Sequence, residues 1–303
     1  MSGFSVRRNV ANVYREPSTS SETVTQAIFG EIVRVIGEAD GMCHITLPDT
    51  YTGWIRADAL LPTYDDGDFL KTSIATLFAE IFSEPAIESE LIVKFCVGSR
   101  VTLAQRPSVG DFIPILLTQD KVAYIHRMCL DISHEPKAGI DAIAAPSTDM
   151  PLDIASLKRR VLEAVGEHTV EVGKRLIGTP YLWGGVTPFG IDCSGFVQLS
   201  YRLSGVQLLR DAYQQFADRR FARCDDGRSL ENAILAPGDL LAFQREGVSR
   251  ITHIGMAIGD GRFIHSSGDQ GVNVEDCTSE RYGATFQGAV RLSSDADLAI
   301  EAA

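Results

Sequence analysis

The stretch "PYLWGGVTPFGIDCSGFVQLSY", residues 180–201, places a single cysteine, Cys193, between a glycine-rich aromatic segment and an apolar run. The run that follows, "SGFVQLSYRLSG" (194–205), has the spacing typical of an amphipathic helix. Cys193 is therefore expected at a helix N-terminus, where unpaired backbone N–H groups favour a thiolate and can bind an oxyanion during acyl transfer. The alternative is a small buried cysteine with a packing role only.

Two histidines further along the chain could serve such a cysteine. His253 opens "HIGMAIG" (253–259) and His265 lies in "RFIHSS" (262–267), two runs that are typical of a β-hairpin. A three-residue loop over 259–261 would pair residue 255 with 265 and place both imidazoles on one face as diagonal neighbours. A two-residue turn would shift the register by one residue and send them to opposite faces.

The hairpin register decides which roles the two histidines can have. With the three-residue loop, His253 is predicted to be the base for the cysteine, and His265 to orient its ring and fix its tautomer. Gly255 would leave room opposite His265. The alternative is that each histidine is an ordinary structural residue.

The rest of the C-terminal half predicts helices first and antiparallel strands afterwards. Apolar residues recur every three or four positions from Asp153 onward, and "DAYQQFADRRF" (211–221) indicates a further helix with Asp211 as its N-cap. Strands are expected at 239–243, 253–259, 262–267 and 286–292. This order is typical of an α+β domain.

The N-terminal half contains an internal repeat. Residues 11–36, "ANVYREPSTSSETVTQAIFGEIVRVI", align without a gap on 79–104, at an offset of 68. Residues 44–55, "HITLPDTYTGWI", match 114–125 at an offset of 70. Each copy reads as short β-branched strands separated by turn residues, which predicts two small all-β barrels.

These patterns together divide the chain. The segment after the second repeat is rich in alanine, proline, glycine and serine, as linkers are. The predicted organisation is a first barrel, a second barrel, a linker and a catalytic domain, over residues 1–64, 65–131, 132–152 and 153–303.

Composition excludes several classes of function. The 303 residues carry 28 basic and 40 acidic side chains, a net charge of −12, which argues against binding nucleic acid or an anionic membrane. No apolar run is long enough to span a bilayer, and the first residues lack the apolar core of a secretory signal, so a cytoplasmic location is expected. The six cysteines show no zinc-site spacing, so no metal or cofactor is expected.

The combination "GTPYLWGG…GIDCSGFVQ…RDAYQQ…PGDLLAF…THIGMAIGDGRFIHSSG" resembles the NlpC-type peptidoglycan peptidases, which are papain-like cysteine enzymes. The resemblance covers about residues 155–292. It implies a triad of Cys193, His253 and His265, with Tyr181 beside the oxyanion site. Tyr181 could equally be a packed aromatic residue.

The pattern "VYREPS…GEIVRVI…YTGWI" resembles bacterial SH3-like domains. Two such barrels before an α+β papain-like domain are similar to cytosolic dipeptidyl peptidases that recycle cell-wall peptides. That similarity implies cleavage of the γ-D-glutamyl–diamino acid bond in short peptidoglycan-derived peptides with a free N-terminal L-alanine. The preference for diaminopimelate or lysine and the oligomeric state stay open, as do two other readings. One is an amidase or acyltransferase on the same scaffold, and the other is a non-catalytic module that binds cell-wall peptides.

The resemblance also implies substrate-binding residues, each with a plainer alternative. Glu31 and Tyr51 of the first barrel would hold the alanine amine, although Glu31 could be a solvated barrel residue. Two sets of residues near the nucleophile would recognise the D-glutamyl group, namely Asp192 with Ser194, and Arg210 with Asp211. Asp211 could instead act as an N-cap alone, and Arg210 as a surface charge.

Overall fold

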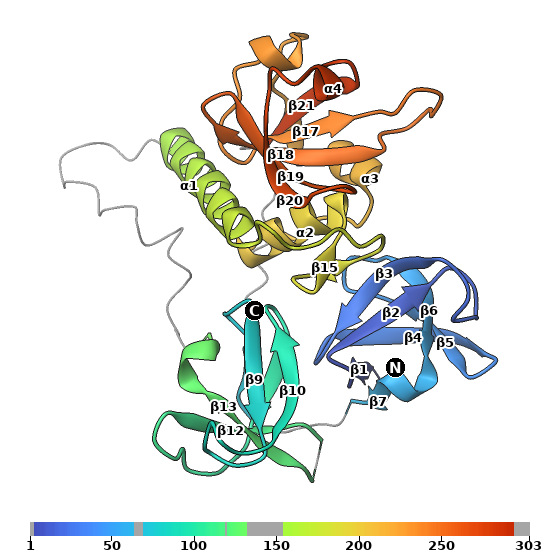
Figure 1. The fold of residues 1–303 in the computed structure, drawn as a ribbon, viewed down its shortest axis with the longest axis vertical. Coiled ribbons are helices and arrows are strands. Elements are labelled where there is room, and N and C mark those ends of the chain that lie inside the picture. The colour runs from blue at the N-terminus through green and yellow to red at the C-terminus, as the bar shows by residue number, and fades with distance from the viewer. Residues whose placement is uncertain (1–2, 64–68, 119, 132–153, 294–303) are drawn as a thin grey trace, which may run out of the picture. The chain divides into compact units, whose positions relative to one another are not determined.

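A computed structural model describes residues 3–63, 69–118, 120–131 and 154–293 of the chain. The chain forms two compact units, Met1–Ile132 and Ser133–Ala303, which are drawn in Figure 1. The predicted linker, 132–152, and the predicted boundary between the two barrels, at 64 and 65, lie outside the described residues.

The first unit contains two antiparallel sheets. The strands of the first sheet are β1 (Phe4–Val6), β2 (Val10–Tyr14), β3 (Thr23–Ile28), β4 (Ile32–Ala39), β5 (Met42–Thr46), β6 (Thr52–Arg56) and β7 (Leu60–Pro62). Those of the second are β8 (Lys71–Ser73), β9 (Phe78–Phe82), β10 (Leu91–Cys96), β11 (Arg100–Leu103), β12 (Phe112–Leu116) and β13 (Val122–His126). Their orders, β3-β2-β6-β5-β4-β1-β7 and β10-β9-β13-β12-β11-β8, follow the same path.

The repeat in the sequence is a repeat in the structure. Strand β2 begins at Val10 and β9 begins at Phe78, which is 68 residues later. Strand β6 begins at Thr52 and β13 at Val122, which is 70 residues later. The offset grows between β4 and β5, so the second copy has two extra residues between the start of β11 and the start of β12. The two all-β barrels predicted from the alignment are confirmed.

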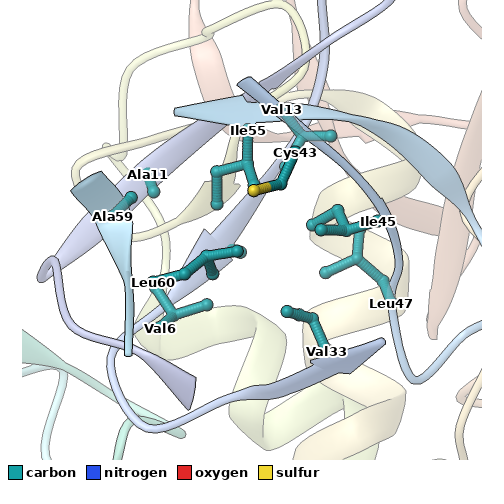
Figure 2. Close-up of a cluster of buried hydrophobic side chains, with 11 residues drawn as sticks. Val6, Ala11, Val13, Val33, Cys43, Ile45, Leu47, Ile55, Ala59 and Leu60 are labelled. Carbon is teal, nitrogen blue, oxygen red and sulfur yellow. The ribbon is translucent and has the colours of Figure 1, made fainter. Parts of the chain in front are cut away.

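Alternation of apolar and polar residues builds the interior of each barrel. In β2 the side chains of Ala11 and Val13 are buried while Asn12 between them is exposed, the period of two expected of a strand with one face on a core. Figure 2 shows the apolar cluster that results in the first barrel, with side chains from several strands pointing toward one another. The second barrel has its own core, centred on Ile81, Phe95 and Ile125.

The second unit joins helices to one antiparallel sheet. Its helices are α1 (Ile154–Arg175), α2 (Cys193–Leu203), α3 (Ala212–Phe216) and α4 (Glu280–Gly283). Its sheet has the order β16-β21-β17-β18-β19-β20, and a separate pair joins β14 to β15. The strands are β14 (Val186–Thr187), β15 (Gly190–Ile191), β16 (Phe221–Arg223), β17 (Leu240–Phe243), β18 (His253–Gly259), β19 (Arg262–Ser267), β20 (Gly271–Asp276) and β21 (Phe286–Leu292). The predicted α+β domain is confirmed.

Helix α1 packs closely on α2 and β18 because a glycine faces them. A Cβ atom at Gly173 would lie 3.0 Å from Cε of Met256 and 3.1 Å from a ring carbon of Phe196. The close contact fixes α2 against the sheet, and therefore fixes where its first turn lies. Over the described part of the chain, no helix combines the length and the apolar character needed to cross a membrane.

The helix predicted over 211–221 is shorter than expected. Helix α3 ends at Phe216, and β16 begins at Phe221. Between them, the Asp218 carboxylate accepts a hydrogen bond from the backbone N–H of Arg220 at 2.9 Å. Such a local side-chain bond competes with the helical backbone pattern and ends the helix early.

Candidate active site

Cys193 is the first residue of α2, and Asp192 is the N-cap of that helix. The Asp192 side chain accepts a hydrogen bond from the backbone N–H of Gly195 at 2.7 Å, which satisfies one of the free donors of the first turn. Gly195 also allows the backbone of Gly185 to approach this helix closely. A Cβ atom at this position would lie 2.3 Å from the carbonyl oxygen of Gly185.

The thiol of Cys193 is buried, with 8% of the residue exposed. Burial raises the pKa of Cys193 to about 12, and the Asp192 carboxylate adds to that rise. The backbone N–H groups of Ile254 and Ser194 lower this pKa, but by less. Burial therefore outweighs the helix N-terminus, and the thiol is protonated at neutral pH.

The hairpin that carries the histidines has the predicted register but not the predicted loop. The connection is a two-residue turn of Asp260 and Gly261, with φ of 52° and 67°, as in a type I′ turn. The register then shifts between Ala257 and Gly259, where two steps along β18 match one step along β19. This β-bulge corrects the one-residue slip that the shorter turn would cause. The predicted three-residue loop is wrong, while residues 255 and 265 still face each other.

The two imidazoles meet on one face of the hairpin. Nε2 of His253 lies 2.7 Å from Nδ1 of His265, and the ring centroids are 4.9 Å apart. Gly255 makes the space: a Cβ atom there would lie 3.1 Å from Cβ of His265. Because Nε2 of His253 is bonded to its neighbour, Nδ1 is the nitrogen left to act on a substrate or a thiol.

Two contacts join the hairpin to the start of α2. The backbone N–H of Ile254, the residue after His253, hydrogen-bonds to the sulfur of Cys193. The hydroxyl of Ser266, the residue after His265, donates to the carbonyl of Ile191 at 2.8 Å. The strands that carry both histidines are thus tied to the sulfur of the nucleophile candidate and to the backbone two residues before it.

Burial keeps both histidines neutral. Burial, together with smaller effects of the neighbouring His265 and Arg281, lowers the pKa of His253 to about 3. It lowers the pKa of His265 to about 4, where Asn273 acts in the opposite direction. A neutral imidazole, one residue before the N–H that binds a protonated thiol, is suited to general-base catalysis, in which the proton leaves sulfur as the sulfur attacks.

Two tyrosines complete the surroundings of the thiol. Tyr181 is half-buried, forms a bridge to Ile191, and has its pKa raised by burial and by the nearby Cys193. Tyr282 of α4 stacks on His253 with a centroid distance of 5.8 Å, and its ring meets His265 at 4.9 Å in an edge-on arrangement. Tyr282 was missed by sequence reasoning because it lies in a four-residue helix with no periodic signal.

Arg210 and Asp192 form a buried ion pair beneath the nucleophile. The guanidinium donates to both carboxylate oxygens of Asp192 and, at 2.8 Å, to the hydroxyl of Ser194. Only 2% of Arg210 is exposed, so its interpretation as a surface charge is wrong. Burial opposes the charge, but Asp192, together with Cys193 and Asp211, outweighs burial, so the pKa of Arg210 is raised. Because these groups bond to one another, their direct contact with substrate stays a prediction.

The remaining predicted site residues lie in three places. Asp211 is the N-cap of α3, and its backbone N–H donates to the side chain of Gln214 at 3.0 Å. Glu31 precedes β4 and accepts from the backbone N–H of Ile28 at 3.2 Å, and Tyr51 precedes β6 and packs against the first barrel's core. Strands β4 and β6 both run antiparallel to β5, so Glu31 and Tyr51 lie at the same end of their sheet.

Comparison with known proteins gives this geometry a context. Residues 178–291 match the NlpC/P60 family, and residues 13–60 match the bacterial dipeptidyl-peptidase Sh3 domain. A gamma-D-glutamyl-L-lysine dipeptidyl-peptidase of Bacillus cereus is 32% identical over 288 residues, covering 90% of this chain and 76% of that protein. Dipeptidyl-peptidase 6 of Lysinibacillus sphaericus is 26% identical over 276 residues, covering 88% of each chain.

The fold has a counterpart among solved structures. An NlpC/P60 family protein from Bacillus cereus ATCC 10987 superimposes with a TM-score of 0.72 at 19% identity, over 96% of this chain and 99% of that one. The similarity thus extends through the barrels as well as the α+β unit. The chain belongs to the NlpC/P60 family, and it is a cysteine peptidase with an SH3-like region before its papain-like domain.

Proposed function

We propose that this peptidase cleaves the γ-D-glutamyl–diamino acid bond of short cell-wall peptides that have a free N-terminal L-alanine. The observation that carries the chemistry is the bonded pair His253–His265, tied through Ile254 to the sulfur of Cys193. The substrate assignment is supported by the two relatives named as dipeptidyl-peptidases, whose alignments run through the barrels as well as the catalytic unit.

In the proposed mechanism, the Cys193 sulfur attacks the γ-glutamyl carbonyl while its proton passes to Nδ1 of His253. The carbonyl oxygen becomes an oxyanion, which backbone N–H groups at the start of α2 and the hydroxyl of Tyr181 stabilise. The carbon–nitrogen bond then breaks, and His253 returns the proton to the departing amine. Water hydrolyses the thioester, restores the thiol and releases L-Ala-γ-D-Glu.

The first barrel is proposed to recognise the free amine of the substrate. Glu31 offers a carboxylate and Tyr51 a phenol at one end of the same sheet. A carboxylate opposite an ammonium forms a charge-assisted hydrogen bond, about twice as strong as a neutral one. An acetylated alanine could not make this bond, so the barrel would restrict the enzyme to peptides that have already been trimmed. This restriction fits recycling of wall peptides in the cytoplasm, which we propose as the role and location.

The test uses mass spectrometry of the products from L-Ala-γ-D-Glu-diaminopimelate and from its N-acetylated form. The expected products are L-Ala-γ-D-Glu and diaminopimelate from the free peptide only. Equal cleavage of both peptides would contradict the amine requirement, and transfer of the acyl group to an added amine in place of water would indicate an acyltransferase.

Two separate cysteine substitutions test the nucleophile, one at Cys193 and a control at Cys277. Cys193→Ala is expected to abolish turnover, and Cys277→Ala to retain it, because Cys277 is also buried in the second unit but lies in the apolar cluster of that unit. Full activity in Cys193→Ala would refute the proposed nucleophile. Absence of cleavage by the unaltered protein would favour a binding module.

A further inference from the structure

An asparagine on the neighbouring strand, Asn273, faces the histidine pair of the active site. Asn273 of β20 is directly opposite His265 of β19 in the antiparallel register. Directly opposed residues project to the same face of a sheet with their Cβ atoms about 4.5–5.5 Å apart. Sequence reasoning did not single out Asn273, because β20 was not among the expected strands.

The orientation of the Asn273 amide is fixed by its other contacts. Its nitrogen Nδ2 donates to the carbonyl oxygen of Gly271 at 2.9 Å and to the hydroxyl of Ser267 at 2.9 Å. A backbone carbonyl can only accept, so the NH₂ group has to face Gly271. The amide oxygen Oδ1 therefore lies on the other side of the group and can only accept.

Two buried polar atoms on this opposed pair of residues lack a hydrogen-bond partner. Within the described part of the chain, Oδ1 of Asn273 and Nε2 of His265 are both buried and have no hydrogen-bond partner. Leaving a buried polar atom unsatisfied costs about 1–3 kcal/mol, so such atoms normally pair. Here each is the partner that the other lacks, one being an acceptor and the other able to donate. The pKa of His265 is consistent with a ring N–H that faces this amide: burial lowers the pKa, and Asn273 acts to raise it.

We propose that Asn273 is a positioning residue that sets the tautomers of both active-site histidines. The acceptor Oδ1 selects the Nε2–H form of His265, which leaves Nδ1 of His265 as an acceptor. That nitrogen accepts from Nε2 of His253 across the 2.7 Å contact, so Nε2 of His253 carries the proton. Nδ1 of His253 is then unprotonated and available as the base. The carbonyl of Gly271 thus fixes the Asn273 amide, and through it the tautomers of His265 and His253.

This inference rests on the proposed function only for the identity of the base, and its test separates the two. Selective ¹⁵N-histidine labelling and long-range ¹H–¹⁵N NMR of the substrate-free full-length enzyme report which ring nitrogens carry protons. The expected result is an Nε2–H tautomer for both His253 and His265. Asn273→Leu keeps the branched shape and the number of side-chain heavy atoms but removes the carbonyl, and is expected to give mixed tautomers of His265.

Kinetics on the γ-D-glutamyl peptide give the second readout. Asn273→Leu is expected to lower kcat by roughly 10- to 100-fold with KM unchanged, as for other residues that orient a ligand through a second group. Asn273→Asp keeps an acceptor and is expected to retain the Nε2–H tautomer and most of kcat. Asn12→Leu, the same change in β2 of the first barrel, is the control and should leave kcat unaltered.

Several outcomes would overturn the inference. An Nδ1–H tautomer of His265 in the unaltered enzyme would do so without any kinetic result, and so would decide the matter if Asn273→Leu fails to fold. An unchanged kcat in Asn273→Leu would refute the claim that Asn273 supports catalysis. If the peptide is not cleaved by the unaltered enzyme, the proposed function fails while the tautomer result still stands or falls alone.

Discussion

Replacing Arg210 by methionine tests whether the ion pair beneath Cys193 holds the start of α2 in place. Methionine keeps most of the apolar volume of arginine but removes its charge and its five donors. The Asp192 carboxylate, 9% exposed, then stays buried without its cation. Among the residues that the structure describes, its remaining hydrogen bonds would be those from the backbone N–H groups of Gly184, at 2.9 Å, and Gly195, at 2.7 Å, and from the hydroxyl of Ser194.

The expected loss follows from these contacts. Removing one partner of a buried ion pair typically costs about 3–5 kcal/mol of unfolding free energy. The two backbone donors still stabilise the carboxylate, so Arg210→Met should lie near the lower end, at about 3 kcal/mol. Asp192→Asn combined with Arg210→Met removes both charges while keeping an N-cap oxygen for Gly195. The double variant should therefore recover about 1–2 kcal/mol of that loss.

Hydrogen exchange along a urea series, read by peptide mass spectrometry, is the suitable assay because it separates the two units of the chain. The free energy of opening is taken from amides of β17 to β19. Arg159→Met is the matched control, since Arg159 is exposed and its pair with Glu163 spans one helical turn at 4.0 Å. It should change the opening free energy by less than about 0.5 kcal/mol. An Arg210→Met enzyme as stable as the unaltered one, or a double variant less stable than the single one, would refute the role of the ion pair.

Three further predictions follow from the same contacts. The pKa of His265 in the folded chain, about 4, lies below the ordinary 6.5, so between those pH values only the unfolded chain takes up this proton. Lowering the pH from 7.5 to 5 should therefore remove about 2 kcal/mol of stability through this residue. Urea unfolding of the unaltered enzyme and of His265→Gln should show that difference in pH dependence. A pH-independent difference would contradict it, since Arg281 and Asp269, the charged groups near His265, keep their charge over this range. Gly195→Ala should abolish activity without unfolding the barrels, because its Cβ would overlap the carbonyl of Gly185, whereas an active variant would show that this approach is dispensable. Glu31→Gln should raise KM for free-amine peptides by roughly 10-fold or more and leave N-acetylated peptides unchanged; equal effects on both would exclude an amine contact.

The barrels and the hairpin show how far periodicity leads. The alignment at offsets of 68 and 70 is reproduced strand by strand, because each copy buries the same alternating positions. The strands over 253–259 and 262–267 are also as expected. The loop between them is not, because a turn and a β-bulge compensated each other, and a bulge leaves no mark in an alternating pattern that it interrupts only once.

What the sequence could not provide was the set of contacts made by single residues far apart in the chain. Arg210 could be interpreted as a surface charge because its ion-pair partner, Asp192, lies 18 residues away in the sequence. Asn273 and Tyr282 lie on a short strand and a four-residue helix whose positions depend on how the sheet is ordered. Motif residues such as Cys193 could be identified because the sequence around them is unusual. Residues that support them, such as Asn273 and Tyr282, were missed because the sequence around them is ordinary.

The most direct test of the central claim is to find the covalent intermediate. The enzyme is mixed with L-Ala-γ-D-Glu-diaminopimelate, quenched in acid within the first turnover, digested and analysed by mass spectrometry. The account predicts an L-Ala-γ-D-Glu acyl group on the peptide that contains Cys193, absent from Cys193→Ala. An acyl group on a different residue, or continued cleavage by Cys193→Ala, would contradict it.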